Sequence, residues 1–135
     1  MLDISNTKIS REVPQQLFGL TDLSSLRIGQ NHICYLSPSI TKLEKLEELY
    51  LPRNDLEHLP PDIGRLKRLR VLDVSDNPDL DELPSQIGFL PLTQLNLTCT
   101  KALKSLPQVC VAGRTPNTPI TTDLSCAVGD TSQGP

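Results

Sequence analysis

The sequence predicts an α/β solenoid, in which similar turns of chain stack so that each turn adds one strand to a short parallel sheet. Two observations predict this fold. Aromatic residues make up only 3% of the 135 residues and Trp is absent, whereas leucine is abundant. The core is therefore expected to be made almost wholly of Leu and Ile, in uniform layers. Apolar residues also recur with a period of about 23 residues, which lies in the range of one solenoid turn.

The repeat is clearest in two consecutive segments, LEKLEELYLPRNDLEHLPPDIGR (43–65) and LKRLRVLDVSDNPDLDELPSQIGF (66–89). Their leucines, one asparagine and one proline occupy corresponding positions, and the second segment has one extra residue between Asn77 and Leu80. Further copies lie before and after these segments, so that the chain holds about five units in one register. The asparagine position of the five units is occupied by Thr7, Asn31, Asn54, Asn77 and Thr100.

Each unit is expected to contribute a short strand at its LxL motif. Alternate residues of a strand face opposite sides, so the two apolar residues point into the core and their neighbours face water. A strand of about three residues cannot bury its apolar face alone. Similar units stacked roughly 4.8 Å apart bury that face together and form a parallel, concave sheet.

The second half of each unit, LPxxIxxL, is expected to return the chain along the convex side as a short helix or 3₁₀ segment. Proline suits the start of such a segment because its missing N–H is not needed there, and Ser37 replaces it in the second unit. The asparagine before this segment is expected to be buried and to bond backbone groups of its own and the next turn. Thr7 and Thr100 offer fewer bonds, which predicts looser terminal units.

The unit LxxLxLxxNxL followed by LPxxI resembles the intracellular class of leucine-rich repeats, and the resemblance covers residues 1–112. That class includes Ras-suppressor-like and Scribble/Erbin-like proteins and the plant intracellular Ras-group proteins. The segment LNLTCTKALKSLP also resembles the repeats of plant immune receptors. The resemblance implies a protein-binding module, with small-GTPase signalling as one expected setting.

Composition and charge exclude several other classes of protein. The net charge of −3 and the pI near 5.3 argue against a general binder of nucleic acid or anionic membranes. No apolar run is long enough to span a bilayer, and the N-terminal residues do not resemble a secretory signal. The four cysteines lack metal-type spacing, which favours free thiols in a reducing compartment. We therefore expect an intracellular, cytoplasmic protein without a cofactor.

The acidic stretch that begins in the fourth predicted strand raises the question of a calcium loop. An EF-hand loop needs a glycine at its sixth position and a bidentate glutamate at its twelfth. Counted from Asp73, those positions hold Pro78 and Pro84. The repeat also places Asp73 on the strand, whereas Asp81 and Glu82 lie around the turn. We therefore predict no metal site, and no cluster of residues suggests an enzyme.

The outward positions of the predicted sheet differ from unit to unit, unlike the leucine positions. The fold does not require particular residues there, so binding specificity can reside in them. A tyrosine among arginines and acids has the composition of an interaction hot spot. The predicted partner-binding face comprises Arg27, Glu48, Tyr50, Arg53, Asp73, Asp76, Gln94 and Asn96.

A second charged group lies on the predicted convex-side segments. It consists of a group of four cations and of two more that lie one repeat period earlier: Arg65, Lys67, Arg68, Arg70, Lys42 and Lys45. These side chains could attract an acidic partner. Acidic residues nearby in the sequence balance part of the charge, and a solvated face also accounts for the group.

The size of the sheet bears on how the chain works. Five strands of about 10 Å at about 4.8 Å spacing give a strip of about 250 Å², whereas a standard interface buries roughly 800 Å² per partner. Either the flanking loops contribute or the chain is part of a longer solenoid. The main prediction is an intracellular scaffold or regulator of signalling that binds a protein through its concave face. The alternative is a fragment of a larger receptor or enzyme, such as a plant-type immune receptor or a repeat-containing kinase, in which the repeats sense or autoinhibit.

The repeat pattern ends near residue 112. The segment 113–135 is rich in Thr, Pro, Gly and Ser and has few large apolar residues. Such a composition cannot bury enough apolar surface to fold, which predicts a disordered tail.

Overall fold

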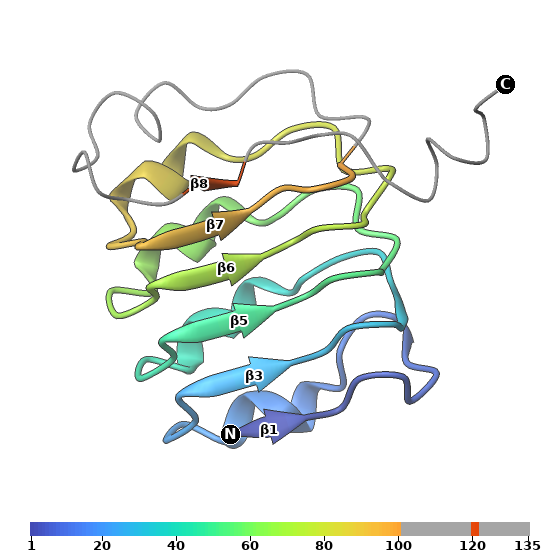
Figure 1. Cartoon of the computed structure of the whole chain (residues 1–135). Helices are drawn as coiled ribbons and strands as arrows, with labels where there is room; N and C mark the ends of the chain where they lie inside the picture. The colour runs from blue at the N-terminus through green and yellow to red at the C-terminus, as the bar shows by residue number, and fades with distance from the viewer. Residues whose placement is uncertain (101–119, 122–135) are drawn as a thin grey trace, which may run out of the picture.

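The computed structural model describes residues 1–100 and 120–121, and it confirms a solenoid with a parallel sheet (Figure 1). Six strands form the sheet in the order β1-β3-β5-β6-β7-β8, and every pairing is parallel. The strands are β1 (Leu2–Asp3), β3 (Ser25–Arg27), β5 (Glu48–Tyr50), β6 (Val71–Asp73), β7 (Gln94–Asn96) and β8 (Ile120–Thr121). One strand from each of the five predicted units accounts for β1, β3, β5, β6 and β7.

The strand register places the repeated leucines side by side in the core. Leu26, Leu49 and Leu72 pair in consecutive strands, and all three are fully buried. Their strand neighbours Glu48 and Tyr50 are half-buried on the opposite face. This alternation is the one that the LxL motif predicts, because successive strand residues point to opposite sides of a sheet.

Four 3₁₀ segments cover the other side of the core, behind the sheet in Figure 1. They are η1 (Gln15–Gly19), η2 (Pro38–Lys42), η3 (Pro61–Arg65) and η4 (Ser85–Phe89). A proline precedes η1, η3 and η4 directly, in extended conformation. In the second unit, Ser37 takes this place, and its hydroxyl oxygen accepts a hydrogen bond from the backbone N–H of Ser39 at 3.1 Å. The serine thus caps the segment where the proline is missing.

The asparagine position works as predicted in the three central units. The Asn54 amide donates to the carbonyl oxygen of Ile28 in the preceding turn at 2.8 Å and to that of Leu51 in its own turn at 3.3 Å. Its Oδ1 accepts from the backbone N–H of Ile33 at 3.1 Å. Asn77 repeats this arrangement one turn further on. Each buried amide therefore joins two turns by satisfying backbone groups that have no strand partner.

Threonine replaces asparagine in the first and last units. A hydroxyl group has one hydrogen to donate, whereas a side-chain amide has two. The Thr100 hydroxyl donates to the carbonyl oxygen of Leu97 at 2.6 Å, and the Thr7 hydroxyl donates to that of Ile4 at 2.7 Å. Both bonds stay within the residue's own turn, and the Thr7 hydroxyl makes a longer contact of 3.4 Å with Oδ1 of Asn31 in the next turn. The looser packing that this difference implies for the terminal units stays a prediction.

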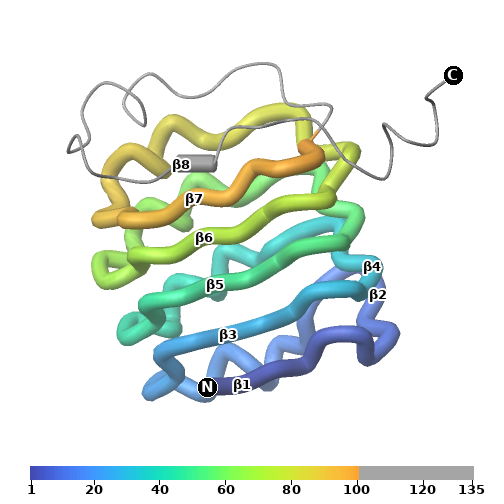
Figure 2. Tube along the Cα trace, in the orientation of Figure 1, coloured from blue at the N-terminus to red at the C-terminus, as the bar shows by residue number. Residues whose placement is uncertain are grey.

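A second, smaller sheet follows the asparagine position. Strands β2 (Ser10–Arg11) and β4 (His32–Ile33) pair in parallel (Figure 2). An isolated bridge between Tyr35 and His58 extends the same stacking to the third unit, and their rings lie 5.7 Å apart. The sequence did not predict this sheet, because its strands of two residues show no apolar alternation.

The predicted boundary at residue 112 and most of the predicted tail lie outside the described residues. Two residues of that segment, Ile120–Thr121, are described as β8, which pairs with Leu95 and Asn96 of β7. Among the described residues, no helix has the length and apolar character needed to cross a membrane.

Candidate protein-binding face

The strand register arranges six of the eight predicted binding residues in two rows across the outer face of the sheet. Arg27, Tyr50, Asp73 and Asn96 are consecutive partners in one row. Glu48 and Gln94 belong to the neighbouring row, which also contains Ser25 and the half-buried Val71. Arg53 and Asp76 are each the third residue after the end of β5 and β6, and they form a third row beyond the strand ends. The structure therefore brings six of the predicted residues together on one face of the sheet, with Arg53 and Asp76 beyond the strand ends; their contact with a partner stays a prediction.

The centre of this face is a stacked pair of side chains. The guanidinium carbon of Arg27 lies 4.3 Å from the ring centroid of Tyr50, within the range of a cation–π interaction. Arg27 is exposed and Tyr50 is half-buried. Burial raises the pKa of Tyr50, and the charge of Glu48 raises it further, whereas the charge of Arg27 lowers it. The Tyr50 ring therefore lies under the guanidinium group of Arg27. Because its pKa is raised, the Tyr50 hydroxyl stays protonated at neutral pH.

Glu48 is also held in place by a residue that the prediction omitted. The Ser25 hydroxyl donates to a carboxylate oxygen of Glu48 at 3.1 Å. Ser25 is buried in the strand next to Glu48 and lies one repeat before it. Its position among the outward residues was visible in the sequence, but its size and neutral side chain gave no sign of a role in orienting Glu48.

Some residues of the first row have a structural role as well. Asp73 Oδ1 accepts hydrogen bonds from the backbone N–H of Ser75 at 2.9 Å and from its hydroxyl at 2.7 Å. Asn96 Oδ1 does the same for Thr98, at 3.0 and 2.8 Å. Asp3 accepts from the Ser5 N–H at 3.0 Å, and this bond lowers the pKa of the Asp3 carboxyl. An Asp or Asn two residues before a Ser or Thr is therefore the sequence signal of a local turn at the strand end.

The third row has an unusual backbone conformation. Gln30, Arg53, Asp76 and Cys99 have φ values of 55°, 59°, 55° and 62°. L-residues other than Asn and Asp rarely adopt this left-handed conformation, which costs roughly 1–2 kcal/mol. Across the row, Nε of Arg53 lies 3.7 Å from Oδ2 of Asp76. The repeat imposes the bend at this position in each turn and thereby directs the two charged side chains outward beside the sheet.

The acidic stretch does not gather around one point. Asp73 is bonded to Ser75 and Asp76 is paired with Arg53, whereas Asp81 and Glu82 are exposed beyond the turn. Within residues 1–100, no three His, Cys, Asp or Glu side chains lie close enough together to hold a metal ion.

A comparison with family models matches residues 45–66 and 68–90 to the Leucine Rich Repeat model. Both matches coincide with turns of the solenoid already described. The fold is a leucine-rich-repeat solenoid. Leucine-rich repeats generally mediate protein–protein interaction and form a typically non-enzymatic module, because a rigid curved sheet offers an extended surface.

Solved structures give a consistent result. The leucine-rich-repeat chain is similar to a leucine-rich-repeat protein of Leptospira interrogans, with 33% identity and a TM-score of 0.77 over 92% of this chain and 31% of that one. It is also similar to the plant peptide hormone receptor RGFR1 in complex with RGF2, with 28% identity and a TM-score of 0.50 over 67% of this chain and 19% of the receptor. The chain thus spans less than a third of either structure. A comparison with curated protein sequences gave no significant match.

Proposed function

We propose that the leucine-rich-repeat chain is an intracellular scaffold or regulator of signalling, which binds a partner protein through the outer face of its sheet. The stacked Arg27–Tyr50 pair supports this proposal most strongly. Tyrosine and arginine are enriched among the residues that dominate binding energy at interfaces. The LPxxI pattern of the repeats makes small-GTPase signalling the first setting to test.

The neighbouring side chains suit a partner with both polar and charged groups. Glu48 and Asp73 lie on either side of Tyr50 in the two rows, and the Arg53–Asp76 pair lies at their edge. Val71 adds a small apolar area between Glu48 and Gln94. An aromatic and apolar centre with a charged rim is the usual anatomy of a protein interface.

The experiment compares affinity capture from native cells by the wild-type chain and by the Tyr50→Ala/Arg53→Ala variant, with identification of partners by mass spectrometry. We expect the variant to recover at least about tenfold less of a partner that binds the sheet face, because substitution of a hot-spot residue costs about 2 kcal/mol or more of binding free energy. Both substitutions are on the surface, so the far-UV circular dichroism spectrum should not change. Normal capture of every partner by this variant would refute the assignment of the face.

The matched control is Tyr35→Ala/Arg11→Ala. It removes the same two residue types from the small β2–β4 sheet region, where the N–H of Tyr35 donates to the carbonyl oxygen of Arg11. Arg11 also has a positive φ, of 70°, close to the 59° of Arg53. The backbone cost of alanine is therefore similar in both variants, and we expect the control to retain the partner.

A second candidate function is that of a sensing or autoinhibitory part of a larger receptor or enzyme. The observation that favours it is the coverage of only 31% and 19% of the similar structures. The same capture experiment tests it through the peptides recovered from the chain itself. Peptides that join these repeats to a kinase or nucleotide-binding domain decide for the receptor, and a product of the size of this chain decides against it.

A further inference from the structure

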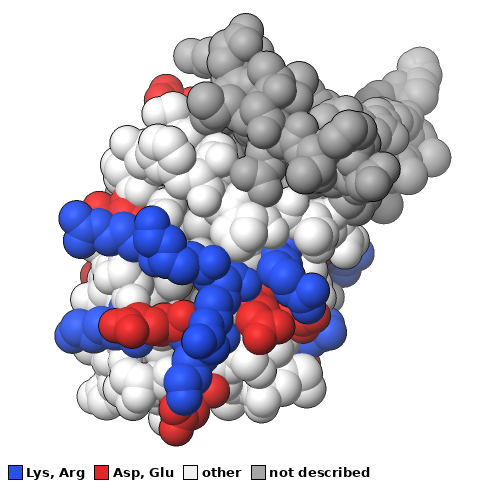
Figure 3. All heavy atoms as spheres, turned by 90° about the vertical axis from the view of Figure 1, so that its left-hand side faces the viewer, with Lys and Arg blue, Asp and Glu red and all other residues white. Residues whose placement is uncertain are grey.

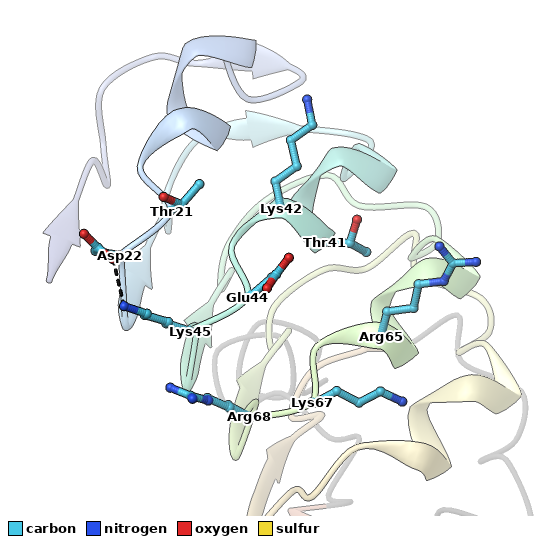
Figure 4. Close-up of a pocket in the computed structure, with 9 residues that line it drawn as sticks. All are labelled: Thr21, Asp22, Thr41, Lys42, Glu44, Lys45, Arg65, Lys67 and Arg68. Carbon is cyan, nitrogen blue, oxygen red and sulfur yellow. Dashed lines mark hydrogen bonds and ion pairs between the residues drawn. The ribbon is translucent and has the colours of Figure 1, made fainter.

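A hollow of about 700 Å³ lies on the side of the solenoid where the 3₁₀ segments lead back to the sheet. Three consecutive turns line it (Figure 4). Thr41 and Lys42 are the last two residues of η2 and Arg65 is the last residue of η3, and the other lining residues follow η1, η2 and η3 in the connections to β3, β5 and β6. The lining residues are Thr21, Asp22, Thr41, Lys42, Glu44, Lys45, Arg65, Lys67 and Arg68.

The lining of the hollow is strongly basic. It contains five Lys or Arg side chains and two acids, a net charge of +3, whereas the whole chain has a net charge of −3. Figure 3 shows this side of the molecule, with Lys and Arg side chains extending across several turns and acids between them. Five of the thirteen cations of the chain are thus gathered at one hollow.

Most of these cations have no acidic partner. Lys45 forms an ion pair with Asp22 at 2.9 Å. The remaining four make no ion pair with another described residue. Elsewhere on the surface, Arg53 and Arg70 are paired with Asp76 and Glu47. The four cations without an ion pair are Lys42, Arg65, Lys67 and Arg68, and with the acid Glu44 they leave a net charge of +3 for an external anion.

The fold itself does not call for cations at these positions. The last residue of the 3₁₀ segment is Lys42 in η2 and Arg65 in η3, but it is Gly19 in η1 and Phe89 in η4. Corresponding positions of adjacent turns are about 4.8 Å apart in a stacked sheet, so like charges placed there repel one another. An arrangement that costs stability and serves no packing role indicates a binding function.

We propose that this basic hollow binds an acidic segment of a partner protein, one rich in Asp and Glu and extended across two turns. The cationic ends do not converge on one point. In Figure 4, Arg65 and Lys67 extend to one side of the hollow and Lys45 and Arg68 to the other. Carboxylates spaced along a chain suit this spread of charges better than a single compact anion does.

This surface is separate from the sheet face. Its residues lie before the strands in each turn, whereas Arg53 and Asp76 follow them. A partner can therefore contact the sheet and the hollow with different segments. Such a partner would bury additional interface area beyond the small sheet. Binding at the hollow does not depend on the function proposed for the sheet face.

The test measures fluorescence anisotropy of a labelled oligoglutamate peptide of about twelve residues, titrated with the full chain at low salt. A twelve-residue extended peptide spans about 40 Å, enough to cross the hollow. We expect saturable binding that weakens as salt is raised. The Arg65→Gln/Lys67→Gln variant should bind about three- to tenfold more weakly, because partly exposed charge pairs contribute modestly.

The matched control is Lys8→Gln/Arg11→Gln, which removes one lysine and one arginine that are exposed and outside the hollow. We expect it to bind the peptide as the wild type does, and the sheet-face variant Tyr50→Ala/Arg53→Ala to do the same. An equal loss in the control would attribute binding to net charge alone and overturn the proposal. Tighter binding of pyrophosphate than of the peptide, measured by displacement, would assign the hollow to a compact phosphate and would also overturn it, as would the absence of peptide binding.

Discussion

At the scale of single residues, the sheet face depends on contacts between residues one repeat apart. Arg27 stacks on Tyr50, Ser25 bonds to Glu48, and Arg53 pairs with Asp76. Each pair is separated by 23 residues, or one turn of the solenoid. The repeat brings equivalent positions of adjacent turns side by side. The residue types at two such positions therefore decide whether the side chains attract or repel each other or do not interact.

The ionisation of Tyr50 tests this environment. Tyr35 and Tyr50 are the two tyrosines of the chain, so the Tyr35→Phe variant allows tyrosinate absorbance to report Tyr50 alone. Burial and then Glu48 raise the pKa, so we expect a midpoint above 10.0 in the folded chain and near 10.0 in urea. In the same background, Glu48→Gln should lower the midpoint and Arg27→Gln should raise it.

The sign of the shift also predicts a pH dependence. A raised pKa means that the folded chain holds the Tyr50 proton more tightly than the unfolded chain. The resulting stabilisation is present below pH 10 and is lost as the pH rises through the folded-state pKa. A folded-state midpoint at or below 10.0 would contradict the placement of Tyr50 beside Glu48.

At the scale of elements, adjacent 3₁₀ segments pack so closely that one position requires glycine. A Cβ atom added at Gly64 in η3 would lie 2.8 Å from the carbonyl oxygen of Gln86 and 2.9 Å from its Cβ, in η4. Gly64 is buried. The backbone conformation would accept another residue, so the requirement comes from the neighbouring segment and not from φ.

The substitution Gly64→Ala should therefore destabilise the chain. We expect a loss of about 1–3 kcal/mol, because η3 and η4 must move apart to admit the methyl group. Urea unfolding followed by far-UV circular dichroism measures the change. Gly19→Ala is the control, since no atom lies within 4 Å of its added Cβ. It should be neutral or slightly stabilising, and equal losses in the two variants would show that the contact with Gln86 does not matter.

At the scale of the whole molecule, the cost of a core substitution should depend on its place in the stack. Leu2 and Leu49 occupy the same position of the repeat, linked through Leu26. Leu49 is fully buried between β3 and β6, whereas Leu2 is half-buried in the terminal strand β1. A solenoid turn is stabilised by its neighbours on both sides, and β1 has a described neighbour on one side.

We therefore expect Leu49→Ala to cost about 3–5 kcal/mol, from lost burial and a cavity that the neighbouring layers cannot fill. Leu2→Ala should cost about 1–2 kcal/mol, because less apolar area is removed from contact. Urea unfolding of both variants at equal concentration checks the difference. Similar costs would contradict a stack in which stability depends on contacts with the adjacent turns.

The repeating frame of this protein can be predicted from the amino-acid sequence alone. Residue type and spacing predict the period, the LxL strands, the asparagine position and the start of each convex segment. They do so because every turn meets a similar neighbour, so a position that is apolar in each unit can be buried in each unit. The rows of the sheet face follow from the same register, which placed Tyr50 beside Arg27 and Asp73.

The way in which surface side chains combine could not be predicted from the sequence and required the three-dimensional structure. The β2–β4 sheet, the bond from Ser25 to Glu48 and the left-handed bend at Arg53 depend on the path of the backbone between the motifs. The basic hollow likewise depends on how far three turns lie apart beside the sheet. Spacing along the chain specifies which residues become neighbours, but the distances and directions of their side chains are set by the packed backbone.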